Sequence, residues 1–330
     1  MRLATFASGD KSAIGAVDRS AETIVDLQAA HRARTGNAHP ALESMLSLIE
    51  GGERALDLAR ELSANSAAKE FSRKLADVRL LAPVPTPQQI REFSVFEQHV
   101  RDAPRASAKI RARLYNQPAP PDDPNPKIPE VFRRAPAFYM MNRFNVVGPD
   151  ADVEWPRYSE GFFDYELEIG MYLGRGGKNI TRENAGKHIF GYTIFNDFSA
   201  RQQQWREMET RMGPTKGKSF DTGNVTGPWI VTADELPGLS SLEVAVRVNG
   251  EEWTRKKMGP MLHDFPAMIA YISQDETLHA GELFASGTVG GCSGMEIDRW
   301  LKIGDVIELE VEGIGILRNR IVAANGKASE

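Results

Sequence analysis

The sequence predicts a β-rich α+β fold. From Ala137 onward most segments show the alternating apolar pattern or the flanking turn residues of β-strands, and only 264–273 shows a clear helical stripe. A strand-dominated order with few helices is typical of the α+β class. At 330 residues, the chain is long enough for one large domain with an additional N-terminal section.

Residues 1–80 are predicted to form this small N-terminal α/β section. Its expected strands and helices lie near 2–6, 14–17, 23–27, 41–49 and 53–62. Gly51 and Gly52 separate the two helices, because consecutive glycines interrupt a helical pattern. A strand at 78–83 should then lead into the main domain, 81–330.

The main domain contains one long irregular segment and several well-marked strands. Residues 116–130 are too rich in proline for a helix or a central strand, which predicts an extended surface loop of polyproline character. Asn249-Gly250 between two strand patterns predicts a type I′ hairpin. The short basic run 255–257 just beyond it is interpreted as a solvated hairpin end. Two closing strands are expected at 306–311 and 316–322.

Composition and charge narrow the functional classes. The chain is 41% hydrophobic and 26% charged, as in ordinary globular proteins, and its net charge of −5 gives no electrostatic argument for nucleic-acid binding. No apolar stretch approaches the ~20 residues that span a bilayer. The single cysteine, Cys292, excludes an internal disulfide, and the first residues lack the apolar core of a signal peptide. We therefore expect a cytoplasmic protein without membrane or nucleic-acid partners.

The segment 162–174 is the most informative part of the chain. Its alternation predicts a strand that places Glu166 and Glu168 on one face, with their Cα atoms roughly 7 Å apart. Two alternatives are open. The strand could be half-exposed with both glutamates in water. If it is buried, the two carboxylates would need a hard cation such as Mg²⁺, Mn²⁺ or Ca²⁺.

A further acidic residue ends another apolar strand. Residues 189–197 read as a buried strand that ends on Asp197, and Ser199 is then a plausible helix N-cap. Arg201 and Gln204 would follow one helical turn apart. The junction between a buried strand and a helix commonly carries ligands or catalytic groups, although Asp197 could also be only a capping residue.

Taken together, these segments resemble the fumarylacetoacetate hydrolase superfamily. The matching blocks are Asp164–Glu168, Asn196–Arg201, Gly217–Phe220 with Gly227–Val231, and the C-terminal Ser286–Thr288, Leu301–Asp305 and Gly313–Asn319. The resemblance extends from about residue 80 to about residue 325. It implies a curled, mixed β-roll with a divalent metal at its mouth, Mg²⁺ being the first choice, held by Glu166, Glu168 and Asp197. It also implies a homodimer.

A block before the proline-rich loop adds two candidates. Glu92 and His99 have the spacing at which the fumarylacetoacetase branch places another metal ligand and the catalytic histidine, with Glu92 standing where that branch has aspartate. Other branches place a histidine on a flexible lid helix, for which 88–115 is the candidate. A third possibility is an amphipathic helix on which both residues share a wet face.

The resemblance also suggests roles for residues elsewhere. Lys218, Arg201 and Gln204 match positions that bind substrate or stabilise an oxyanion, although the two basic residues could only neutralise the acidic cluster. Glu296 corresponds to the acid that orients the histidine, while Tyr139 and Thr288 are candidates for substrate contact. Met208 replaces a substrate-binding tyrosine, which argues against fumarylacetoacetate itself as the substrate.

The expected activity is therefore metal-dependent hydrolysis of a carbon–carbon bond in a small β-diketo or acylpyruvate-type acid. His99 would activate water, and its ordinary pKa suits work near neutral pH. The alternative is decarboxylation or isomerisation of a 2-oxo or 2-hydroxydienoic acid at the same site, as in aromatic catabolism, which requires no attacking water. A non-enzymatic protein with this fold is less favoured because Glu166, Glu168 and Asp197 are all present.

Overall fold

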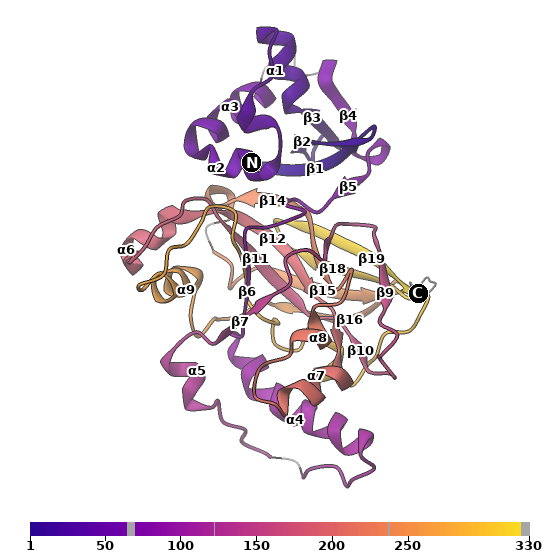
Figure 1. Cartoon of the computed structure of the whole chain (residues 1–330). Helices are drawn as coiled ribbons and strands as arrows, with labels where there is room; N and C mark the ends of the chain where they lie inside the picture. Colours follow the sequence, from indigo (N-terminus) through magenta and orange to yellow (C-terminus); the bar gives the residue numbers. More distant parts are fainter. Residues whose placement is uncertain (65–69, 122, 237, 325–330) are drawn as a thin grey trace, which may run out of the picture.

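The computed structural model describes residues 1–64, 70–121, 123–236 and 238–324, and it confirms the α+β class and the mixed sheets. The N-terminal section lies at one end of the molecule, and the main domain carries a long helix at the other end (Figure 1). Strands from both sections join one large sheet. The division into 1–80 and 81–330 therefore remains a prediction about sequence segments.

The large sheet runs through the whole molecule. In spatial order its strands are β4 (Ser72–Lys74), β3 (Thr23–Asp26), β2 (Lys11–Asp18), β1 (Arg2–Ser8), β14 (Asn224–Thr232), β12 (Ile189–Asp197), β11 (Leu167–Leu173), β17 (Leu283–Ala285), β6 (Ile90–Phe93) and β7 (Phe138–Met141). Two short strands join it at the side, β5 (Leu80–Leu81) on β1 and β8 (Val146–Val147) on β14. Most pairs are antiparallel, whereas β17–β6 and β14–β8 are parallel.

Two smaller sheets complete the main domain. One contains β16 (Glu251–Lys257), β15 (Glu243–Val248), β18 (Val306–Val311), β19 (Gly315–Ala323) and β9 (Asp152–Trp155) in that order. The other is the pair β10 (Phe163–Asp164) and β13 (Ser199–Ala200). The predicted hairpin is confirmed, since Asn249 and Gly250 both have positive φ, of 53° and 80°, between β15 and β16.

Helices cover the ends and edges of the sheets. They are α1 (Leu27–Thr35), α2 (Met45–Glu50), α3 (Gly52–Ala64), α4 (Glu97–Leu114), α5 (Glu130–Arg134), α6 (Arg182–Ala185), α7 (Arg201–Met208), α8 (Thr215–Lys218), α9 (Phe265–Ile272) and α10 (Gly294–Ile297), with 3₁₀ turns at Pro40–Leu42, Leu75–Asp77, Gly186–His188 and Ala233–Glu235. The helical stripe at 264–273 is confirmed as α9. Asp264 caps it by accepting a hydrogen bond from the Ala267 N–H.

Several local predictions are wrong in detail. Only β5 forms within 78–83, and the segment 88–115 begins with strand β6 before α4 starts at Glu97. Glu92 therefore lies on a strand and shares no helical face with His99. Ser199 belongs to β13, and it is Ala200 that precedes α7, without a side-chain cap. Helix α1 was not expected; Asp26 caps its start, and Gly36 ends it with a φ of 79°.

Within 116–130, the described residues contain no helix or strand until α5 begins at Glu130, and most of them are exposed. Residue 122 lies outside the described part. The described residues thus confirm the irregular surface segment that its prolines predict.

The central strand β11 is fully buried, so a charged side chain on it needs a partner. Every residue of β11 is buried, and it lies between β12 and β17 in the middle of the sheet. The prediction of a half-exposed strand at 162–174 is therefore wrong.

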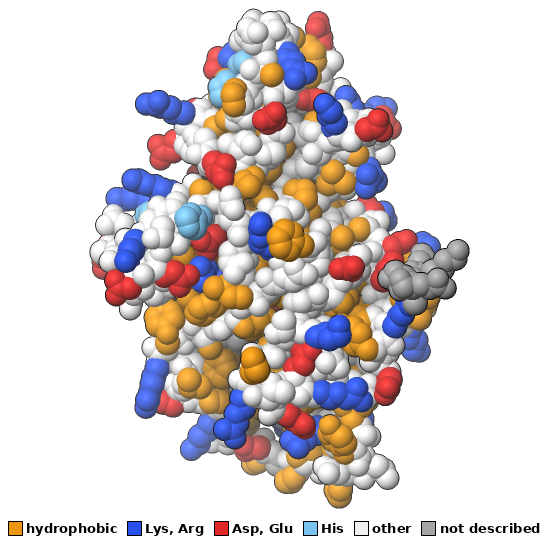
Figure 2. All heavy atoms as spheres, in the orientation of Figure 1, with side chains coloured by type: hydrophobic (Ala, Val, Ile, Leu, Met, Phe, Trp, Pro, Cys, Tyr) orange, Lys and Arg blue, Asp and Glu red, His pale blue; other side chains and the backbone are white. Residues whose placement is uncertain are grey.

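On the surface, by contrast, basic and acidic side chains are interspersed on the face shown in Figure 2. Within the described part of the chain, every helix is too short or too polar to cross a bilayer.

Candidate metal and proton-transfer site

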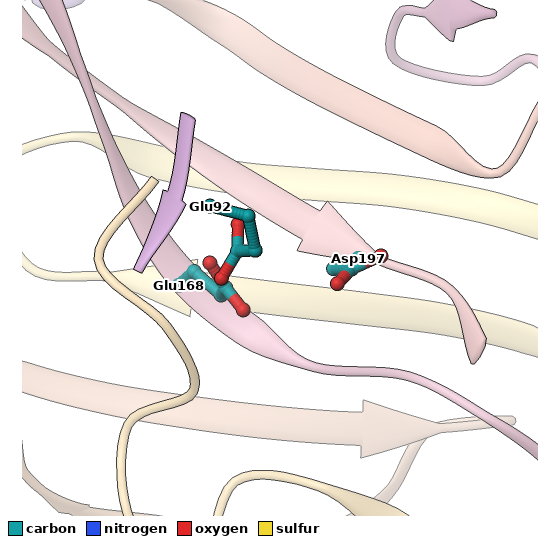
Figure 3. A group of neighbouring side chains, drawn as sticks. All are labelled: Glu92, Glu168 and Asp197. Carbon is teal, nitrogen blue, oxygen red and sulfur yellow. The ribbon is translucent and has the colours of Figure 1, made fainter. Parts of the chain in front are cut away.

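Three strands of the large sheet bring Glu92, Glu168 and Asp197 together. Glu168 lies on β11, Asp197 at the end of β12, and Glu92 on β6, which the short strand β17 separates from β11. Their carboxyl groups lie close together between these strands (Figure 3). One oxygen from each side chain lies within 4.8 Å of the others. The sheet itself therefore assembles the acidic group from residues far apart in the sequence.

The three carboxyl groups are buried and incompletely paired. Glu92 is 3% exposed, and Glu168 and Asp197 are fully buried. Glu92 Oε2, Glu168 Oε1 and Asp197 Oδ1 have no hydrogen-bond partner among the described residues. Burial, and then the neighbouring carboxylates, raise the pKa of Glu92 and of Glu168 well above the ordinary range. Burial also raises the pKa of Asp197 to about 7, although Lys218 opposes the shift.

These features fit a hard divalent cation. Carboxylate oxygens are the ligands that Mg²⁺, Mn²⁺ and Ca²⁺ prefer. A buried carboxylate oxygen without a donor is strongly unfavourable, and a cation bound by all three oxygens would remove this cost. The three side chains therefore form a candidate site for a divalent metal.

Glu166 lies beside this group and has different partners. Its Oε1 accepts a hydrogen bond from Arg201 at 2.6 Å, and its Oε2 accepts one from Lys218 at 2.5 Å. Burial would raise the pKa of Glu166, but Arg201 and Lys218 hold it below its ordinary value. Glu166 is thus ionised and paired on both oxygens. Its role as a metal ligand remains a prediction.

Lys218 and Arg201 neutralise the acidic cluster, as one sequence interpretation proposed. Lys218, buried at the end of α8, bridges Glu166 and Asp197, with Nζ 2.6 Å from Asp197 Oδ2. Arg201, the first residue of α7, donates from Nε to Asp164 Oδ2 at 2.8 Å and from Nη1 to Gln204 Oε1 at 3.0 Å. Carboxylate partners raise the pKa of both basic groups despite burial, so both remain charged.

The sequence interpretation quoted Asp164 within the matching block but gave it no role. Its carboxylate accepts hydrogen bonds from the backbone N–H groups of Gly294 and Met295, at 2.7 and 3.0 Å, as well as from Arg201. It therefore fixes the first turn of α10 against β10, which precedes the strand that carries Glu168. An aspartate at the start of the block was the available signal, but its long-range partners were not apparent from spacing.

His99 and Glu296 form a pair next to this cluster, with side chains that are 12% and 3% exposed. His99 lies in the first turn of α4 and Glu296 on α10, and His99 Nδ1 is 3.1 Å from Glu296 Oε2 in a contact that lacks hydrogen-bond alignment. Burial lowers the pKa of His99, but Glu296 more than offsets this and the pKa is raised overall. The carboxylate of Glu166 also raises the pKa of His99, so the imidazole lies close enough to Glu166 to interact with its charge. The sequence-predicted pair is thus in contact.

The other predicted substrate residues surround the cluster at different depths. Tyr139, on β7, donates from its hydroxyl to Asp197 Oδ2 at 3.3 Å. Burial and the carboxylate of Asp197 raise its pKa well above 10, so it stays a donor. Thr288 is buried directly after Gly287, whose N–H donates to Glu168 Oε2 at 3.0 Å. Gln204 is engaged by Arg201, and Met208, at the end of α7, is 48% exposed.

Cys292 is packed in the hydrophobic core. It is buried, and burial followed by Glu296 raises its pKa to about 12. A thiol at this pKa is protonated near neutral pH and is a weak nucleophile.

Comparisons with known proteins identify the family of this chain. Residues 98–322 match the family model described as fumarylacetoacetate (FAA) hydrolase C-terminal. The oxaloacetate tautomerase YisK of Bacillus subtilis is 29% identical over 306 residues, which cover 91% of this chain and 93% of the relative.

Two solved structures of different activity are also similar. A fumarylacetoacetate hydrolase from Exiguobacterium antarcticum has a TM-score of 0.73 at 27% identity, and a 5-carboxymethyl-2-hydroxymuconate delta-isomerase from Mycobacterium smegmatis has 0.67 at 26%. Each comparison covers 98% of this chain and 100% of the other. These relatives catalyse different reactions on one fold. With a family match over more than half of its length, this chain belongs to the fumarylacetoacetate hydrolase family.

Proposed function

We propose that the protein is a metal-dependent hydrolase that cleaves a carbon–carbon bond in a small β-diketo acid of the acylpyruvate type. The observation that supports this most is the largely buried His99–Glu296 pair beside the acidic cluster. A histidine oriented by a carboxylate is the arrangement that activates water in many hydrolases. In this site it lies on α4, directly after the strand that carries Glu92.

Glu92, Glu168 and Asp197 would hold the metal, with Mg²⁺ as the first choice and Mn²⁺ or Ca²⁺ as alternatives. When bound, such a cation acts as a Lewis acid that polarises the oxygens of a chelating 2-oxo acid. Glu166 is a further candidate ligand, because each of its oxygens accepts one hydrogen bond and keeps a second lone pair. Its ion pairs with Lys218 and Arg201 also give Glu166 a role in balancing charge.

The proton transfers follow from the chain's own groups. Neutral His99 would accept a proton from water as the oxygen attacks the carbonyl remote from the carboxylate of the substrate. The negative charge of Glu296 stabilises the imidazolium that results, which is why it raises the pKa of His99. His99 would then return the proton to the carbon that leaves.

Donors for the developing oxyanion are also at hand. Lys218 uses two N–H groups on Glu166 and Asp197 among the described residues, so its third N–H is a candidate donor. The hydroxyl of Tyr139, which its raised pKa keeps protonated, would be a second donor if it exchanged its 3.3 Å hydrogen bond to Asp197 for one to the oxyanion. Charged donors in a buried site stabilise such an oxyanion more strongly than they would in water.

A second candidate is keto–enol tautomerisation of a small 2-oxo acid. Its support is the similarity to an oxaloacetate tautomerase across 91% of the chain. In this reaction His99 would move a proton between carbon and oxygen of the substrate, and no water would be consumed. The same acidic cluster would serve both reactions, so the residues that bind metal do not distinguish them.

Product analysis separates the two reactions. Purified protein would be incubated with acylpyruvates and with enol-oxaloacetate in the presence of Mg²⁺ or Mn²⁺, in water enriched in ¹⁸O. Hydrolysis predicts pyruvate and a carboxylic acid that carries one solvent oxygen. Accelerated enol–keto conversion without cleavage of any diketo acid would contradict the proposal in favour of tautomerisation.

A variant tests the role of the histidine. His99→Ala should lower turnover by ~10²–10⁴-fold while metal affinity changes little, because the carboxylates remain. His279→Ala, at an exposed histidine, is the matched control and should keep full activity. A fully active His99→Ala protein would exclude His99 as the base.

A further inference from the structure

We propose that Lys256 is a positioning residue for the His99–Glu296 pair, acting through Gln98 and the Gly290–Gly291 turn. This inference rests on the proposed role of that pair. The sequence interpretation assigned Lys256 to a solvated hairpin end, but the structure shows a different environment. Its neighbours Arg255 and Lys257 are exposed, whereas Lys256 is half-buried and points to the base of α4.

Lys256 joins two segments that each lead to one member of the pair. Its Nζ donates to the side-chain oxygen of Gln98 and, at 2.8 Å, to the carbonyl of Gly290. Gln98 immediately precedes His99 in the first turn of α4. One ammonium group therefore ties the start of the histidine-bearing helix to the glycine turn.

The glycine turn in turn holds Glu296. The N–H of Gly291 donates to Glu296 Oε1 at 3.0 Å, and the hydroxyl of Ser293 donates to Oε2 at 2.8 Å. Strand β16 holds this turn a second time, because the Thr254 hydroxyl donates to the Gly291 carbonyl at 3.0 Å. Thr254 and Lys256 are two residues apart on one strand face, so β16 fixes two consecutive carbonyls of the turn.

Close packing makes the link stiff. A Cβ atom at Gly290 would lie 2.4 Å from Cβ of Gln98, so the first turn of α4 rests directly on the glycine backbone. Gly291 has a φ of 77°, a conformation that side chains of L-residues rarely adopt. Small shifts of this turn would therefore move both Gln98 and the N–H that binds Glu296.

The contact between His99 and Glu296 is sensitive to such shifts. It measures 3.1 Å and lacks hydrogen-bond alignment, so a small displacement of either side chain would break it. The charged groups that act on the imidazole are Glu296 and Glu166, which favour its protonated form, and Arg201, which opposes it. Loosening the contact to Glu296 would leave burial to dominate and would favour the neutral imidazole.

The test compares Lys256→Met with Lys257→Met, which removes the adjacent exposed lysine, and with Lys256→Arg, which keeps a donor. NMR titration of labelled histidine, with the His99 signal assigned by its loss in His99→Ala, reads out the pair without any substrate. We expect the pKa of His99 to fall in Lys256→Met and to stay unchanged in Lys257→Met. Lys256→Arg should restore it at least in part.

Kinetics provide the second readout. Misplaced catalytic groups should lower kcat by ~10–10²-fold in Lys256→Met with little change in KM, since Lys256 contacts no group of the metal cluster. Gln98→Leu should have the same effect, and the double variant should be no worse than either single one. If Lys256→Met does not fold, Gln98→Leu carries the test.

The His99 titration tests the role of Lys256 independently of the proposed hydrolysis. An unchanged titration of His99 in folded Lys256→Met overturns the inference, whatever the enzyme catalyses. A lowered pKa of His99 together with failure to cleave any diketo acid would support the inference and contradict only the proposed hydrolysis.

Discussion

The metal-free protein should lose stability as the pH rises from about 5.5 to about 8, because its acidic cluster resists ionisation. Asp197 has a pKa of about 7 in the folded protein against an ordinary value of 3.8. A carboxyl group with a raised folded pKa keeps its proton longer in the folded protein than in the unfolded chain. Its contribution is therefore most favourable at low pH and is lost as the pH rises through the folded pKa.

The magnitude follows from the same shift. Each pH unit between the two pKa values costs about 1.4 kcal/mol, so the interval from about pH 5.5 to about pH 7 removes ~2 kcal/mol through Asp197 alone. The raised pKa values of Glu92, Glu168 and His99 act in the same direction. A divalent metal at 100 times its Kd should raise the free energy of unfolding by about 2.7 kcal/mol.

The assay is thermal or urea unfolding of EDTA-treated protein across this pH range, with and without Mg²⁺ or Mn²⁺. Asp197→Asn should show a weaker pH dependence, because its amide does not titrate. Asp275→Asn, whose side chain is 94% exposed, is the control and should behave like the unmodified protein. Metal-free protein that is equally stable or more stable at the higher pH would refute the reasoning.

Four other outcomes are expected. Arg201→Met should cost ~3–5 kcal/mol in urea unfolding, because Asp164 and Glu166 would lose a buried cation; a loss below ~1 kcal/mol would show that these carboxylates find other partners. Gly287→Ala should weaken metal binding in calorimetry, because the Gly287 N–H holds Glu168. Gly287 has a φ of 79°, and a Cβ there would lie 2.5 Å from the Phe93 carbonyl oxygen, so the substitution should displace this N–H. An unchanged metal affinity would contradict this. Glu296→Gln should move the acidic limb of the kcat/KM profile to lower pH, because the pKa of His99 loses the carboxylate that raises it; an unmoved limb would remove Glu296 from the mechanism. Light scattering should give twice the 36.5 kDa mass of one chain, whereas a constant single-chain mass would reject the homodimer.

The parts of the site that sequence reasoning found are those where a polar residue interrupts a buried pattern. Glu168 and Asp197 occur in strands that are otherwise apolar, and such residues need a specific partner. The assignment of Glu92 to a helix was a possible interpretation because Ile90–Phe93 is too short to show alternation, and only pairing with β17 and β7 defines it as a strand.

The different partners of Glu166 and Glu168 were not predictable from the sequence. Strand alternation places both on one face, but regular pairing is interrupted between β10 and β11, and Glu166 forms an isolated bridge to Ser293 instead. Its oxygens are consequently available to Arg201 and Lys218. The contact of Lys256 with Gln98 was not predictable either. The two residues are 158 positions apart, and local spacing does not indicate such a long-range contact.

The connection between β6 and α4 has a consequence for metal binding and proton transfer. Only Ser94, Val95 and Phe96 separate the strand of Glu92 from the helix of His99. Glu92 is fixed by hydrogen-bonded strands on both sides of β6, whereas α4 is joined to the rest of the protein through side chains, among them Gln98, Ser107 and Arg113. Because these contacts are different, a change that loosens the first turn of α4 should displace His99 and leave Glu92 in place. Binding of the cation and transfer of the proton should therefore be separable by substitutions, the first at β6 and the second at the start of α4.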